Sequence, residues 1–303
     1  MASLVTIALA ATALLGCLAT LERGERPLFL DRSSASEEKH DGGRPRRGED
    51  KLQLAGSGSN VPLTRALIAA YVRQYPEKKV MLHESIGSSG GVQAVLDGAI
   101  DLGLISRDLT AQERQAALEL VPYAWVAVVF ASHPSVPVRD LSQQEVLAMY
   151  SGAQARWPDG TAVTVLQREA GDSAHLIAGR AIPGFLAVDE LARTEQRWRM
   201  LFHDRAMQEA LMGTPGAIGL SDLGGVKIQN LAIKILSFNG IEASQDQVLS
   251  GRYPLHKPLS FVCQKPVSAP IQHFIDFVQS SAGKRMIEDS GYIALDSGQE
   301  PSP

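Results

Sequence analysis

The sequence predicts an α/β protein built around a mostly parallel β-sheet. Along residues 52–295, short apolar runs alternate with amphipathic stretches, which is the pattern of repeated βαβ units. Segments rich in glycine and serine stand between several apolar runs and the amphipathic stretches that follow them. These residues are numerous enough for one large or two modest domains.

The first part of the folded region contains three predicted strands and two predicted helices. Asn60 followed by Pro62 predicts a helix N-terminus at which the Asn side chain caps the helix. Gly98 is a suitable end for the second helix. In chain order we expect a strand over residues 52–55, a helix from Pro62, a strand over 80–86, a short helix from Gly91 and a strand over 102–105.

The second part repeats this alternation after a long run rich in β-branched residues, 121–131, which could cross between two lobes. A Gly-rich stretch, 213–225, surrounds one of the later strands. We expect helices over residues 142–150, from Ser173, over 186–212 and over 271–287, and strands over 162–167, 217–220, 233–238 and 259–263.

The N-terminal residues predict export. Residues 2–16 are uncharged and mostly apolar, as in a signal peptide, and the run is short for a membrane-spanning helix. Cys17 closes a Leu-Leu-Gly-Cys sequence typical of bacterial lipoproteins and would carry the lipid, unless the leader is cleaved elsewhere. Residues 17–50 then predict a lipid-anchored flexible linker, and residues 296–303 a disordered tail.

Composition argues against several classes of function. The formal net charge of −4 gives no sign of nucleic-acid binding. Two cysteines form no disulfide framework, and no paired Cys cluster, HExxH pair or Walker A sequence is present. We therefore expect no metal and no cofactor.

Three Gly/Ser-rich segments precede predicted helices, at residues 56–60, 87–91 and 171–173. Helix N-termini present free N–H groups and the positive end of the helix dipole, so converging N-termini favour a bound anion. Arg107 and Arg168 each follow a predicted strand, where a guanidinium can hold two oxyanion oxygens. For either arginine alone, a surface ion pair is an equally good interpretation.

The sequence Gly87-x-Ser89-x-Gly91 also matches the nucleophile elbow of serine hydrolases, with His256 or His273 as a candidate base. Against this enzyme hypothesis, only one predicted strand separates the motif from the linker, and no HGGG-type motif is present. A third interpretation is that the glycines only make a tight turn.

Together these motifs resemble those of the periplasmic phosphate-binding proteins of ABC transporters. The resemblance spans nearly all of residues 52–295 and depends on the order of several short motifs, each weak alone. These motifs are GSGSNVP, IGSSGGV, DLGLISRDLT, the segment 168–173, AIGLSDL and SGRYPLHKPLSFV.

The resemblance implies a two-lobed periplasmic-binding-protein-like fold of type II, with a ligand cleft between lobes that close on the anion. Lobe I would comprise residues 51–128 and 260–295, and lobe II residues 129–259. The implied ligand-binding residues are Ser59, Asn60, Ser88, Ser89, Ser106, Arg107, Arg168, Asp172 and Ser173. Arg107 stands where the family often has Asp, which bears on specificity.

By this resemblance the protein is a non-catalytic receptor, expected to be monomeric and held at the periplasm or cell envelope. It would capture inorganic phosphate and deliver it to an ABC transporter permease. A carboxylate facing the ligand, Asp172 or Asp108, would favour hydrogen phosphate over ionised sulfate. Sulfate, molybdate and tungstate remain alternative ligands, and a phosphate sensor without transport remains an alternative role.

Overall fold

Two sets of parallel strands are joined through a pair of antiparallel strands. The computed structural model describes residues 51–295, so the predicted signal peptide, Cys17, the linker up to residue 50 and the tail from residue 296 lie outside the described residues. The main sheet has the strand order β2-β1-β3-β11-β4-β8-β6-β7. Strands β1, β2 and β3 pair in parallel, as do β6, β7 and β8, whereas β11 and β4 pair antiparallel with their neighbours.

The strands of the main sheet are β1 (Lys51–Gly56), β2 (Lys79–Leu82), β3 (Leu102–Ile105), β4 (Leu118–Ser132), β6 (Thr164–Arg168), β7 (Arg199–Leu201), β8 (Ala217–Asp222), β9 (Lys234–Ile235), β11 (His256–Gln264) and β12 (Ile293–Ala294). A separate two-stranded sheet pairs β5 (Asp140–Leu141) with β10 (Ser237–Phe238).

The helices are α1 (Val61–Gln74), α2 (Gly87–Leu96), the 3-10 turn η1 (Glu113–Gln115), α3 (Gln143–Tyr150), α4 (Ser173–Ala181), α5 (Phe185–Thr194), α6 (Asp204–Gly213), α7 (Leu223–Ile228), α8 (Gln245–Leu249), α9 (Ala269–Gln279) and α10 (Ser281–Asp289). Among residues 51–295, none of these helices combines the length and the apolar character that crossing a bilayer requires.

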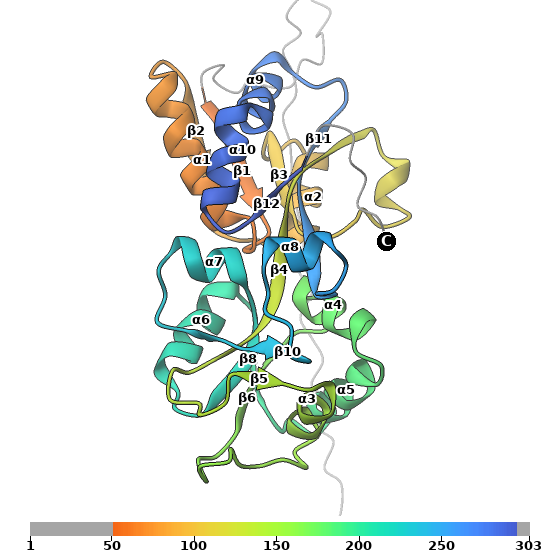
Figure 1. Cartoon of the computed structure of the whole chain (residues 1–303). Helices are drawn as coiled ribbons and strands as arrows, with labels where there is room; N and C mark the ends of the chain where they lie inside the picture. Colours follow the sequence, from red (N-terminus) through yellow and green to blue (C-terminus); the bar gives the residue numbers. More distant parts are fainter. Residues whose placement is uncertain (1–50, 296–303) are drawn as a thin grey trace, which may run out of the picture. The chain divides into compact units, whose positions relative to one another are not determined.

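Strand β4 belongs to both sets of strands. Its residues 118–127 pair with β11, and its residues 128–132 pair with β8. In Figure 1, β4 runs from the half that contains β1, β2 and β3 into the half that contains β6 and β8. The long β-branched run that predicted a crossing strand is therefore this element.

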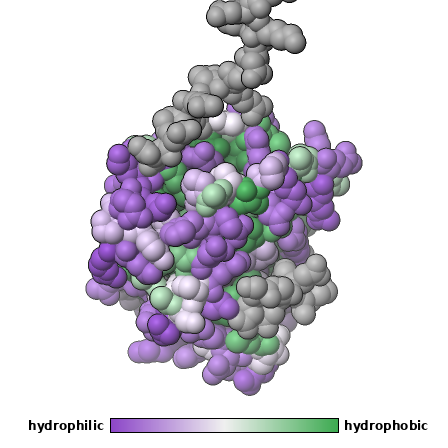
Figure 2. Space-filling view, turned by 90° about the horizontal axis from the view of Figure 1, so that it is seen from above, coloured by the Kyte–Doolittle hydropathy of each residue, from purple (hydrophilic) through white to green (hydrophobic). Residues whose placement is uncertain are grey.

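The buried apolar side chains form separate cores on the two sides of this crossing. One cluster takes its residues from 127–255 together with Ile293. Two further clusters take theirs from 52–126 and 259–294. The surface seen from above in Figure 2 is mostly hydrophilic, with smaller apolar areas between the polar side chains. The fold is a mixed α/β fold of the predicted class, and the proposed lobe boundaries stay a prediction.

Three predicted helices differ from the observed ones. The region 186–212 contains two helices, α5 and α6, separated by strand β7, because the chain turns at Gln196 with a positive φ of 52°. The terminal helix is divided at Ser280, whose side chain accepts a bond from the backbone of Gly283 and starts α10. Helix α2 begins at Gly87, so the Gly/Ser segment forms its first turns instead of a loop before it.

Candidate functional site

The site lies where helices α1, α2 and α4 begin, next to the end of β3. Ser106, directly after β3, is the centre of a network of serine hydroxyls. Its Oγ lies 2.8 Å from Ser57 Oγ, 3.4 Å from Ser88 Oγ and 2.9 Å from Ser173 Oγ. Ser173 opens α4, which packs in the other core, so this network joins segments from both parts of the sheet.

Lys257 on β11 lies beside this network and is almost fully buried, with 1% of its side chain exposed. Its Nζ donates to Ser59 Oγ at 2.8 Å and to Ser173 Oγ at 2.9 Å, and it forms an ion pair with Asp222 Oδ1 at 2.9 Å. The ammonium group thus makes two hydrogen bonds and one ion pair within the described residues. Lys257 thereby connects the openings of α1, α4 and α7.

Lys257 also determines the direction of its own bonds to two of these hydroxyls. An ammonium group can only donate, so Ser59 and Ser173 accept from it and keep their own hydrogens for donation. Ser88 Oγ likewise accepts from the backbone N–H of Ser106 at 3.1 Å. Ser59, Ser88 and Ser173 therefore each retain a hydroxyl hydrogen that can be donated to an oxyanion.

Arg168, the last residue of β6, is the second buried cation, and 6% of its side chain is exposed. Its Nη2 donates to Asp172 Oδ2 at 2.7 Å, whereas Glu169 and Asp204 lie 3.5 Å away from Nε and Nη1. The buried Nε has no hydrogen-bond partner among the described residues. Because a buried N–H without a partner is costly, this guanidinium is suited to a further acceptor.

Three aspartates stand at helix openings around these two cations. Asp172 caps α4, Asp204 is the first residue of α6, and Asp222 precedes α7. Burial raises the pKa of Asp204, while Arg168 opposes this shift. With Glu169, four carboxylates lie around the two cations, so loss of the negative charge of Asp204 would favour a bound anion.

Asp204 also reaches across to the opening of α1. A Cβ placed on Gly58 would collide with Asp204 Oδ2, so only glycine lets the two segments approach this closely.

Of the predicted site residues, Ser59, Ser88, Ser106, Arg168, Asp172 and Ser173 lie within this cluster. Asn60 is fully buried and bonds elsewhere: its Nδ2 donates to the Ile105 carbonyl at 3.2 Å and to Tyr123 Oη at 3.0 Å. It occupies the N-cap position of α1, but the predicted side-chain cap is wrong, because no side-chain cap bond forms. Its contact with a ligand stays a prediction.

Ser89 and Arg107 lie together outside the network. Arg107 Nη2 donates to Ser89 Oγ at 3.0 Å, and the same guanidinium holds Glu113 in a two-point contact at 2.8 Å. The hydrogen bond from Arg107 is the main cause that lowers the pKa of Glu113 to about 2. The guanidinium of Arg107 is therefore already matched by a carboxylate, and its contact with a ligand also stays a prediction.

The candidate bases of the hydrolase hypothesis are bound to other groups. His273 Nδ1 lies 2.7 Å from Tyr71 Oη, and the ring of His256 lies against Trp125. The partner of Ser89 Oγ is Arg107, a donor that cannot accept its proton. The described residues also contain no group of three or more His, Cys, Asp or Glu side chains that could hold a metal ion.

Sequence reasoning missed Lys257, Asp204 and Asp222 as members of the cluster. A lysine directly before the apolar run 258–263 was a usable signal, because a lysine in a buried strand needs partners. Asp222 ends a buried strand in the same way as Arg168 does. Nothing near Asp204 in the sequence indicates that it lies beside Arg168.

The comparisons with known proteins agree with this fold. A model of the PBP superfamily domain matches residues 37–282, and the chain belongs to that superfamily. The predicted resemblance is thereby confirmed. The phosphate-binding protein PstS of Borreliella burgdorferi is 22% identical over 254 residues, covering 82% of this chain and 91% of that protein.

PstS of Bacillus subtilis is 23% identical over 276 residues, covering 86% of this chain and 88% of that protein. A crystal structure of a putative phosphate ABC transporter substrate-binding protein with bound phosphate, from Clostridium perfringens, has a similar fold. It matches with a TM-score of 0.71 at 23% identity, covering 82% of this chain and 100% of that one.

Proposed function

We propose that this protein is an extracytoplasmic receptor that captures inorganic phosphate and presents it to an ABC transporter permease, without catalysis. The observation that carries the proposal is the buried cluster in which donor hydroxyls, Lys257 and the incompletely bonded Arg168 converge. Relatives named as phosphate-binding proteins across most of the chain support phosphate as the oxyanion.

The proposed ligand contacts come from both sides of the crossing strands. Ser59, Ser88 and Ser106 would donate from one side, and Arg168 and Ser173 from the other. Such an arrangement gains its full set of contacts only when both sides are engaged, so phosphate stabilises the closed form. We further propose that Cys17 carries a lipid that holds the receptor, as a monomer, at the cell envelope.

Calorimetry of the purified protein against phosphate, sulfate, molybdate and tungstate tests the proposal. Phosphate should bind most tightly. Arg168→Ala should weaken phosphate binding by about 1.5–3 kcal/mol, the scale of a charged hydrogen bond. Arg107→Ala is the matched control, with a much smaller effect expected because Glu113 already holds that guanidinium.

The geometry thus predicts different losses of phosphate affinity for the two variants. Equal losses of phosphate affinity in Arg168→Ala and Arg107→Ala would indicate that the anion binds between the two arginines instead of at Arg168. Tight binding of sulfate or molybdate with no binding of phosphate would contradict the assignment of the ligand.

A further inference from the structure

A pocket of about 510 Å³ opens beside the anion site and is lined from both sides of the crossing strands. We propose that the receptor also takes phosphomonoesters, with the phosphoryl group at Arg168 and the serine hydroxyls and the organic group in this pocket. The proposal rests on the proposed function, because it uses the same phosphoryl contacts.

The size of the pocket is the first argument. Pockets for small organic ligands span about 300–1,000 Å³, and a bare tetrahedral oxyanion needs much less room. The pocket therefore offers space that inorganic phosphate alone does not use.

The connection to the anion site is the second argument. Gly58 and Asp204 both line the pocket, and Asp204 Oδ1 lies 3.5 Å from Arg168 Nη1. One side chain thus separates the pocket from the guanidinium. If the Asp204 carboxylate turns aside, an ester oxygen on a phosphoryl group at Arg168 faces the pocket.

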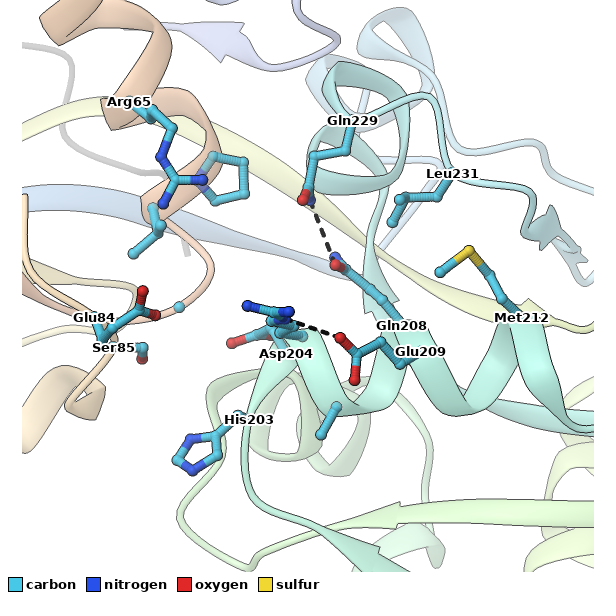
Figure 3. A pocket seen from close by; sticks show the side chains of 15 residues that line it. Arg65, Glu84, Ser85, His203, Asp204, Gln208, Glu209, Met212, Gln229 and Leu231 are labelled. Carbon is cyan, nitrogen blue, oxygen red and sulfur yellow. Dashed lines mark hydrogen bonds and ion pairs between the residues drawn. The ribbon is translucent and has the colours of Figure 1, made fainter.

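The chemistry of the lining is the third argument. Figure 3 shows Arg65 from α1, Glu84 from the segment before α2, and Gln208 from α6 around the pocket. Arg65 has no hydrogen bond or ion pair with another described residue. Glu84 interacts electrostatically with Arg205, which also lines the pocket, and Gln208 Oε1 accepts from Gln229 Nε2 at 3.4 Å. The cationic Arg65 is therefore available for a carboxylate of the organic group, and Glu84 lies on the same pocket to receive an ammonium group in exchange for Arg205.

O-Phospho-L-serine combines these features, since it carries a phosphoryl group, an ammonium group and a carboxylate. Calorimetry of the full-length protein with inorganic phosphate and with O-phosphoserine, each alone and in competition, tests the proposal. O-Phosphoserine should bind and should be displaced by phosphate, because the two share the phosphoryl contacts.

Arg65→Ala should weaken the binding of O-phosphoserine on the order of tenfold, which is the effect of one charged contact, and should leave the affinity for phosphate unchanged. Arg73→Ala is the matched control, because Arg73 is an exposed arginine on the same helix and does not line the pocket. It should change neither affinity.

Binding of phosphate without binding of O-phosphoserine would overturn this inference and leave the proposed function intact. Unchanged O-phosphoserine affinity in Arg65→Ala, or equal loss for both ligands, would overturn it as well. If the parent protein binds neither ligand, the proposed function fails and the inference fails with it.

Discussion

The buried pair of Lys257 and Asp222 gives the sharpest prediction about stability. Lys257→Met removes the cation and leaves the Asp222 carboxylate, 5% exposed, without its partner. Breaking a buried ion pair in this way costs about 3–5 kcal/mol. For a chain of this size, each kcal/mol lowers Tm by about 2–4 °C, so a loss of roughly 6–20 °C is expected.

Thermal unfolding followed by circular dichroism measures this loss, and Lys265→Met is the matched control. Lys265 directly follows β11 and pairs with Glu119 at 3.0 Å, but the two side chains are 55% and 40% exposed. Solvent-exposed pairs contribute about 0–1 kcal/mol. Similar losses in the two variants would refute the argument that burial makes the Lys257 pair important.

The double variant Lys257→Met, Asp222→Leu separates stability from binding. It removes both charges, so most of the lost stability should return. Phosphate binding should remain weak, because Ser59 and Ser173 lose the donor that orients their hydroxyls. A double variant that binds phosphate as tightly as the parent would show that Lys257 has no role in the site.

Three further predictions concern specificity, pH and the backbone. Asp204→Asn should improve sulfate binding relative to phosphate on the order of tenfold, because it removes a carboxylate beside Arg168 that can accept the proton of hydrogen phosphate and repels fully ionised sulfate; calorimetry with both anions checks this. The pKa of Glu113, lowered from 4.5 to about 2, contributes stability above pH 4.5 that is lost as the pH falls toward 2. In Glu113→Gln, the free energy of unfolding measured with urea should therefore vary less with pH over that range. The difference from the parent should be at most about 3 kcal/mol, and solvent screening of this partly exposed pair makes it smaller. Gly56→Ala should destabilise the protein by at least about 1–3 kcal/mol, since φ is +146° and a Cβ would meet the backbone of β3, whereas Gly213→Ala meets nothing and should have little effect.

Local patterns were sufficient for much of the fold. The buried strand at residues 102–105 was predicted with the bounds of β3, and the crossing strand was predicted within β4. Apolar runs that are buried on both faces carry this information in the sequence itself. The boundary between α5 and α6 was missed because the leucines and alanines of 186–212 fit a continuous helix, and strand β7 depends on pairing with β6.

In the candidate site, too, some residues could be predicted from local sequence patterns and others could not. Ser88, Ser106 and Ser173 could be found because each stands next to a predicted strand end or helix start. The roles of Lys257 and Asp204 depend on residues distant in the sequence: Lys257 Nζ meets Ser59, 198 positions away, and Asp204 meets Arg168, 36 positions away. Such contacts depend on the folding of the whole sheet, and no short sequence motif predicts them.

The direct bond between Ser106 and Ser173 has a kinetic consequence. A neutral hydroxyl pair contributes only about 0.5–1.5 kcal/mol net. Lys257 also joins Ser59 to Ser173, so separating the two sides breaks one charged hydrogen bond as well, which contributes about 1.5–3 kcal/mol. Uptake should then depend on how often the unliganded protein breaks these bonds, and the lifetime of the complex should depend in addition on the charged contacts at Arg168. The serines that hold the unliganded form together are thus the same groups that must be released to receive the anion.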